Sequence, residues 1–153
     1  MKSNKIFDVQ ITDLNIYSDE KGSVLHMLRS DSSIFADFGE IYFSKIYYKS
    51  IKAWKQHQEM TMNIAVPVGK IKLVLYDDRD YSESQGQIDE FDLSDDNYKL
   101  VTIPPLIWVG FQGIEKEPSM LANLASIPHS PREVKRLDTF DKRIPYKWHF
   151  PNY

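Results

Sequence analysis

Residues 51–63, which read IKAWKQHQEMTMN, place two lysines and a histidine close to a tryptophan. Lys52, Lys55 and His57 carry groups that can bind anions or exchange protons. Because alternate residues of a strand point the same way, we expect these three side chains to share one face. Such a polar row forms either a solvated edge or the floor of a pocket. Trp54 and two nearby methionines favour burial of the strand on at least one side.

The composition of this stretch argues against a metal site. Zinc and iron sites use three or four ligands from His, Cys, Asp and Glu. The chain has four histidines and no cysteine. Glu59 follows His57 by two residues, but position 55 is a lysine, a cation that cannot share a coordination sphere. We therefore expect no bound metal and no other cofactor.

A third cation, Arg79, lies in YDDRDYSES, residues 76–84, at the end of a strongly apolar run. One interpretation is a solvated loop. The other is a guanidinium that lies at the mouth of a barrel and binds phosphate. The chain carries no Gly-rich phosphate loop, no Rossmann fingerprint and no nucleophile elbow, so phosphate binding would depend on such isolated cations.

Short runs with strand character must position these residues, and they recur at intervals of about ten residues, separated by turn residues. The runs cover residues 5–11, 23–29, 40–48, 62–68, 70–78, 87–93, 98–103 and 106–112. In one of them Ile71, Leu73 and Leu75 alternate with lysines, which is typical of a half-buried strand. The high content of aromatic residues, 13%, also favours a β-rich fold over a helix bundle.

Two segments have the character of a helical turn. One is residues 32–38, SSIFADF. In the other, HSPREVKRL, Ser130 can cap, Pro131 occupies the first helical position and Glu133 completes a capping box. The sequence therefore predicts a single all-β domain over residues 1–153, a barrel or a double sheet, with one or two short helical turns.

The overall composition excludes several classes of partner. A formal charge of −3 with 27% charged residues offers no basic surface for nucleic acid or for lipid headgroups. The N-terminal stretch has no signal-peptide-like apolar run, and no segment approaches the ~20 apolar residues of a membrane span. The absence of cysteine gives no indication of export. We expect a cytoplasmic protein that binds neither nucleic acid nor membrane.

Four segments in this order, WKQHQEMT, GKIKLVLYDDR, LVTIPPLIWVGF and RIPYKW, resemble the dTDP-4-dehydrorhamnose 3,5-epimerase family. The similarity extends from about Ile6 to Trp148 and is strongest to the short branch found in bacterial surface-polysaccharide clusters. It implies a cupin-type jelly roll, usually a homodimer that exchanges N-terminal strands. It also implies metal-independent epimerisation of a nucleotide-diphospho-4-keto-6-deoxy sugar, by removal of a proton alpha to the ketone and return of one to the other face.

In the family pattern a histidine is the base, a tyrosine on a later strand is the acid, and an aspartate near the C-terminus polarises the histidine. Lys52 matches the basic residue that holds the diphosphate, and Trp54 matches the large residue before the base. Lys55 stands where the catalytic histidine is expected, and His57 matches a second histidine of the short branch. Asp138 matches the C-terminal aspartate. The resemblance thus implies Lys55, His57 and Asp138 as catalytic residues.

Besides Arg79, which is a candidate because of its charge and position, the resemblance implies further residues that bind substrate. Lys21 and His26 belong to the early segment that reaches the partner's nucleotide, and Ser44 matches a family serine. Trp108 lies in PPLIWVGF, where the family run carries a histidine at the position after this tryptophan. No tyrosine lies within SMLANLAS, where the acid is expected, and Asn123 is the nearest polar residue there.

A lysine in place of the histidine changes the proton chemistry. Histidine accepts a proton readily at neutral pH, whereas the pKa of a lysine must fall by about three pH units, a bias of about 4 kcal/mol. Burial beside Trp54 and other cations act in that direction. A protonated Lys55 would instead stabilise an enolate oxygen while His57 removes the proton.

Three functions remain open from the sequence. The first is a sugar-nucleotide epimerase or ketoisomerase in which Lys55 and His57 share the acid and base roles. The second is a cupin that binds a nucleotide sugar and has lost catalysis. The third is an interaction subunit of a polysaccharide-assembly complex whose barrel is filled by side chains.

Overall fold

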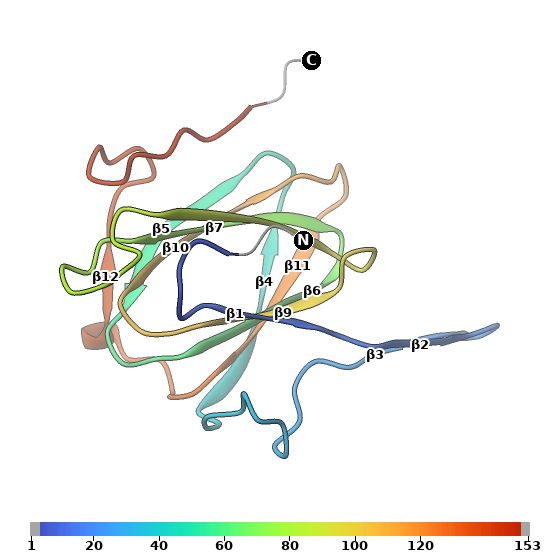
Figure 1. Cartoon of the computed structure of the whole chain (residues 1–153). Coiled ribbons are helices and arrows are strands. Elements are labelled where there is room, and N and C mark those ends of the chain that lie inside the picture. The colour runs from blue at the N-terminus through green and yellow to red at the C-terminus, as the bar shows by residue number, and fades with distance from the viewer. Residues whose placement is uncertain (1–3, 151–153) are drawn as a thin grey trace.

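Two antiparallel sheets of five strands each face one another within residues 4–150, the part of the chain that this computed structural model describes (Figure 1). The first sheet has the order β1 (Gln10–Asp13), β9 (Lys99–Ile103), β6 (Met62–Val68), β11 (Ser119–Ala125) and β4 (Glu40–Ile46). The second has the order β12 (Val134–Arg136), β5 (Ile51–His57), β10 (Ile107–Gly113), β7 (Lys70–Asp77) and β8 (Ile88–Ser94). The all-β jelly roll expected from the sequence is confirmed.

The core lies between the sheets and is built from alternate residues of their strands. Ile71, Leu73 and Leu75 of β7 point inward and are completely buried, as their period of two predicts. Val74 between them is also completely buried, because the C-terminal segment with Trp148 packs across the outer face of the second sheet. That outer layer anchors β5, the strand that carries the lysines.

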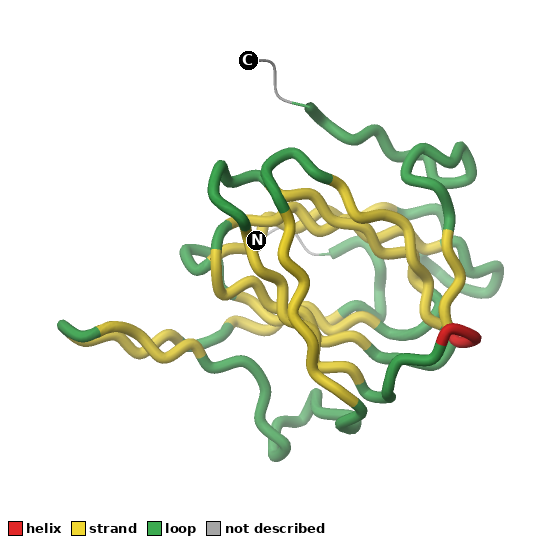
Figure 2. Tube along the Cα trace, turned by 180° about the vertical axis from the view of Figure 1, so that it is seen from behind, coloured by secondary structure: helices red, strands yellow, loops and turns green. Residues whose placement is uncertain are grey.

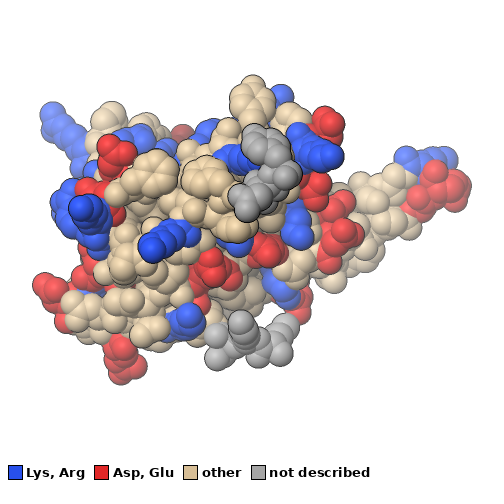
Figure 3. All heavy atoms as spheres, turned by 90° about the horizontal axis from the view of Figure 1, so that it is seen from above, with Lys and Arg blue, Asp and Glu red and all other residues tan. Residues whose placement is uncertain are grey.

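A short hairpin of β2 (Ile16–Asp19) and β3 (Gly22–Leu25) projects away from the two sheets, as Figures 1 and 2 show from opposite sides. In the view of Figure 3, acidic and basic side chains alternate over the main body and at the tip of this projection, and neither sign dominates. None of the helices in residues 4–150 has the length and apolar character needed to cross a membrane.

The structure differs from the sequence-based expectation in its helical turns. In HSPREVKRL a 3₁₀ turn covers only Pro131–Glu133, the residues that follow form strand β12, and the Ser130 side chain makes no capping bond. The Glu133 carboxylate binds elsewhere, as described below. Residues 32–38 form turns and irregular chain, so the helix expected there is wrong. A segment of seven residues is too short to repay helix nucleation without tertiary support.

Two strand positions also differ from expectation. The first strand begins at Gln10 because the Asp89 carboxylate binds the backbone amides of Lys5 and Ile6 at 2.8–2.9 Å and holds them out of the sheet. The local composition of SMLANLA did not indicate strand β11, and only the family resemblance implied a strand there. Pairing with β4 on one side and β6 on the other imposes the extended conformation.

Candidate active-site cavity

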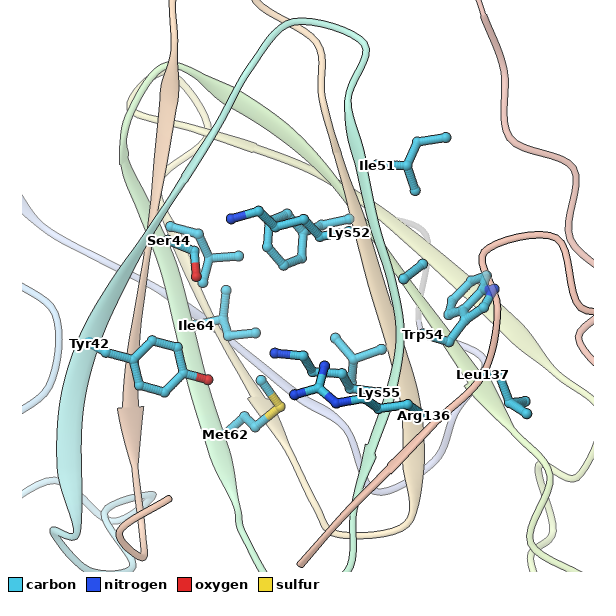
Figure 4. Close-up of a pocket in the computed structure, with 14 residues that line it drawn as sticks. Tyr42, Ser44, Ile51, Lys52, Trp54, Lys55, Met62, Ile64, Arg136 and Leu137 are labelled. Carbon is cyan, nitrogen blue, oxygen red and sulfur yellow. The ribbon is translucent and has the colours of Figure 1, made fainter. Parts of the chain in front are cut away.

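A cavity of about 430 Å³ opens between the two sheets. Its lining comes from strands of both sheets and from the segment after β12: Tyr42, Ser44, Ile51, Lys52, Ala53, Trp54, Lys55, Met62, Ile64, Val109, Phe111, Leu121, Arg136 and Leu137 (Figure 4). Most of the lining residues are apolar, and the polar groups reach into the cavity from opposite sides. A space of this size accommodates a small organic ligand.

A β-bulge brings two lysines of β5 to the same side of the sheet. Lys52 and Lys55 are three residues apart, so in a regular strand they would face opposite ways. Opposite them, Phe111 pairs with Lys52 and Val109 with Lys55, so three steps along β5 match two along β10. The bulge therefore restores the common face that a simple alternation does not provide.

Gly110 of β10 permits the close approach of strands at this bulge. A Cβ at that position would lie 2.7 Å from the Cβ of Ala53 and 2.9 Å from the Trp54 ring. Trp54 itself points outward into the second hydrophobic layer, where its indole N–H donates to the carbonyl of Thr139 at 3.1 Å. Trp54 and Ala53 are both among the residues that line the cavity.

Three cations converge on the cavity, and its lining includes no carboxylate. The Lys52 ammonium donates to the backbone carbonyl of Lys45 at 2.9 Å. Figure 4 shows the Lys52 amine directed toward Ser44, and the Lys55 amine directed toward Tyr42 with Arg136 beside it. Desolvation by the cavity walls lowers the pKa of Lys55, and the charges of Arg136 and Lys52 lower it further. The concentration of positive charge favours binding of an anion, and in the absence of a ligand it increases the neutral fraction of Lys55.

Tyr42 and Asn123 form a polar pair on the opposite wall. They are directly paired residues of β4 and β11, and the Asn123 amide donates to the Tyr42 hydroxyl oxygen at 2.9 Å. Asn123 is completely buried, so it reaches the cavity only through this tyrosine. Burial raises the pKa of Tyr42, with Glu40 and Glu133 acting in the same direction and Asn123 opposing.

His57 lies on the strand of the lysines but does not line the cavity. Its ring is buried, and its Nδ1 lies 2.7 Å from a carboxylate oxygen of Glu133. The other oxygen of Glu133 accepts from the backbone amides of Glu59 and Met60 at 2.9 and 2.8 Å. Burial opposes ionisation of Glu133, but the hydrogen bonds from His57 and the two amides outweigh it and lower the pKa of that carboxyl. This pair braces the end of β5.

Arg79, expected at the mouth of the barrel, is instead held in a closed ionic network. Its guanidinium donates to Asp77 at 2.8 Å and to Asp8 at 2.7–2.8 Å. Arg79 donates to both carboxylate oxygens of Asp77, and Ser82 and Ser84 donate to one of them, Oδ2, at 2.6 and 2.7 Å. Both residues of the inner pair are buried, which leaves Arg79 no free donor edge to present to the cavity.

Four other expected site residues lie away from the cavity. Lys21 is in the turn of the projecting β2–β3 hairpin, and His26 follows that hairpin, where it contacts the Tyr17 ring. Asp138 is exposed beyond β12. Trp108 faces the opposite side of its sheet, and its indole N–H donates to Asp78 at 2.8 Å. Of the expected binding residues, Ser44, Lys52 and Trp54 are those that the structure brings together with Lys55.

Two polar cavity residues, Tyr42 and Arg136, were not identified from the sequence. Tyr42 precedes Ser44 by two residues in the predicted strand 40–48, so its alternation with Ser44 was a usable signal. Arg136 carried no such signal, because β12 reaches the cavity only by pairing with β5. Within residues 4–150 no group of three or more His, Asp or Glu side chains could hold a metal ion.

Known proteins share both the sequence pattern and this architecture. A dTDP sugar isomerase of Desulfovibrio desulfuricans superposes with a TM-score of 0.92 at 43% identity, covering 94% of this chain and 92% of that one. The chain is 34% identical over 143 residues to the probable low-salt glycan biosynthesis epimerase Agl13 of Haloferax volcanii, covering 92% of this chain and 88% of that protein. It is 28% identical to the spore coat polysaccharide biosynthesis protein SpsL of Bacillus subtilis, covering 92% and 94%. The family model for dTDP-4-dehydrorhamnose 3,5-epimerase matches residues 3–153. The chain therefore belongs to the dTDP-4-dehydrorhamnose 3,5-epimerase family.

Proposed function

We propose that this protein is an epimerase or isomerase of a nucleotide-diphospho-4-keto-6-deoxy sugar, and that Lys55 is its base. The observation that carries the proposal is the cavity in which Lys52, Lys55 and Arg136 meet without a carboxylate. Membership of the family supports the reaction class, and the name of the dTDP sugar isomerase supports a dTDP-linked substrate.

The arrangement of the cavity suits the two ends of such a ligand. Lys52 and Arg136 provide charge and donors for the diphosphate, with a planar guanidinium that can bind two phosphate oxygens at once. Between the walls, Ile64, Phe111 and Leu121 provide an apolar surface for the sugar ring. Ser44 adds a hydroxyl at the boundary of these two regions.

Lys55 fits the role of base better than His57 does. Its amine lies in the cavity, and its pKa is lowered by desolvation and by neighbouring cations, which increases the neutral fraction at a given pH. His57 is buried behind the cavity wall, and one ring nitrogen is engaged by Glu133.

Deuterium incorporation from solvent tests this assignment. In D₂O, the wild-type protein should exchange a C–H proton alpha to the ketone of dTDP-4-keto-6-deoxyglucose, as followed by proton NMR. The Lys55→Met variant should lose exchange by about 1,000-fold, because the proton acceptor is gone. Lys135→Met removes a lysine that does not line the cavity and should exchange like the wild type. Equal exchange in wild type and Lys55→Met would refute the base assignment.

The departures from the family pattern support a second candidate, a cupin that binds a nucleotide sugar without catalysis. Lysine replaces the base and β11 carries no tyrosine. This candidate predicts that dTDP binds, measured by calorimetry, while the wild type shows no exchange with any 4-keto sugar. The open cavity of about 430 Å³ argues against the interaction-subunit alternative, which requires a barrel filled by side chains.

We also propose that the protein is a cytoplasmic homodimer with exchanged N-terminal strands, acting in surface-polysaccharide (O-antigen or capsule) biosynthesis. The names of Agl13 and SpsL support a role in glycan synthesis. For the dimer, β4 exposes Ile41 and Phe43 on its outer side with 46% and 60% of their surface accessible. Within residues 4–150 the strands of the projecting hairpin pair only with each other. Light scattering that gives a monomer at micromolar concentration would refute the dimer.

A further inference from the structure

Each wall of the cavity carries a group that could exchange a proton with a bound sugar. Lys55 extends from β5 of the second sheet, and Tyr42 extends from β4 of the first sheet. Figure 4 shows the amine and the hydroxyl directed toward one another across the open space. A flat sugar ring bound between the walls would therefore expose one face to the lysine and the opposite face to the tyrosine.

Asn123 orients the hydroxyl of Tyr42. The buried Oδ1 atom of Asn123 accepts from the backbone amide of Asn63 at 3.0 Å, so its Nδ2 must be the atom that faces Tyr42. This amide donates to the phenolic oxygen at 2.9 Å, which occupies the oxygen as an acceptor. Within residues 4–150 the phenol has no acceptor for its own proton, so that proton remains free to point into the cavity.

The strand register places Tyr42 beside the position where the family resemblance implies a tyrosine that acts as the acid. The family resemblance implies a tyrosine that acts as the general acid on the strand that is β11 here. That strand has Asn123 instead. The residue paired directly with Asn123 on the adjacent strand is Tyr42, whose side chain emerges on the same face. The hydroxyl is thus supplied from the neighbouring strand.

We infer that Tyr42 donates the proton that inverts the carbon, on the face opposite Lys55, and that Asn123 positions it. The inference rests on the proposed function, since it assumes a 4-keto sugar between the two walls. It identifies the group that converts simple proton exchange into a change of configuration.

The proposed step balances as follows. The lone pair of the Lys55 amine takes the proton from the carbon alpha to the ketone, and the C–H electrons form the enolate. The enolate carbon then takes the proton of Tyr42 on its other face, leaving a phenolate beside the Asn123 amide. Lys55 is left as an ammonium, and proton exchange with solvent restores both groups. Burial raises the pKa of Tyr42, which keeps the phenol protonated before the step.

The inference predicts that inversion and exchange separate when the hydroxyl is removed. In Tyr42→Phe, Lys55 still forms the enolate, and its ammonium can return a solvent-derived proton to the same face. Inversion should fall by about 100-fold while exchange falls much less, so the ratio of inverted to exchanged product drops. Both quantities are read from one NMR time course of dTDP-4-keto-6-deoxyglucose in D₂O.

Controls separate this result from a structural effect. Tyr98 is a buried tyrosine directly before β9, in a separate hydrophobic cluster outside the cavity. Tyr98→Phe therefore removes a comparable hydroxyl and should keep the wild-type ratio of inverted to exchanged product. A structural role for Tyr42 would lower inversion and exchange together and would overturn the inference. So would an unchanged ratio in an active Tyr42→Phe protein. A wild type without any exchange would overturn the proposed function and this inference with it.

Discussion

Arg79 and the cavity cations make opposite uses of positive charge. Arg79 is buried between Asp77 and Asp8, and its donors are satisfied within the protein. The hydrogen bonds from Arg79 and the two serines outweigh burial and hold the pKa of Asp77 well below its usual range. Lys55 and Arg136 instead share a cavity that no carboxylate lines. Charge that is neutralised inside the fold stabilises it, whereas charge left without a counterion is available to a ligand.

The largest expected effect is on stability and concerns the closed network. Arg79→Met leaves the Asp77 carboxylate buried without its partner, which should lower the free energy of unfolding by about 4 kcal/mol. Lys55→Met removes one of several like charges and should leave that free energy unchanged or raise it. Urea unfolding followed by fluorescence measures both. Equal losses of unfolding free energy in the two variants would contradict the proposed difference between Arg79 and the cavity cations.

A smaller effect is expected on ligand affinity. Arg136→Met removes a guanidinium from the cavity and should weaken dTDP binding by about tenfold, the typical worth of one charge-assisted hydrogen bond. Isothermal titration calorimetry measures the change, and Lys135→Met on the same strand is the matched control. Weaker binding in the control alone would place the diphosphate outside the cavity.

The smallest effect is a displacement of the pH profile. A base must be neutral, so exchange should rise with pH until Lys55 has lost its proton, with an inflection below the ordinary lysine value of 10.5. Arg136 and Lys52 both hold that pKa down, and Tyr42 is the remaining titratable group facing the amine. Arg136→Met should therefore move the inflection upward, and more than Lys52→Met does. An inflection that moves downward would contradict the electrostatic account.

Much of the fold was predictable because strand signals are local. The strand at 62–68 was anticipated as a run with strand character that ends at Gly69, and the strand predicted at 70–78, observed at Lys70–Asp77, was anticipated from its apolar alternation. In contrast, β11 could not be recognised, since its extended conformation depends on two neighbours from distant parts of the chain. The helix expected at 32–38 failed for a related reason, because a single turn of helix requires tertiary contacts that the sequence does not reveal.

The site was predictable only in part. The segment of Lys52 and Lys55 was identified correctly as a candidate, but simple alternation could not account for their common face, which a bulge opposite Gly110 provides. Proximity of cationic residues to a strand end could not distinguish Arg79 from Lys55. The role of Arg79 depends on Asp8, which is 71 residues away in sequence. The role of Asn123 depends on Tyr42, which is 81 residues away.

By itself the sequence determined that the chain forms strands, that its net charge offers no basic surface for nucleic acid, and that a lysine occupies the position of the family's histidine. These properties follow from residue type and short-range periodicity, which act within a few positions of the chain. Only the tertiary structure decided which cations meet an acid and which meet a cavity. That outcome depends on the register between strands, and register joins residues whose separation in sequence carries no local signal.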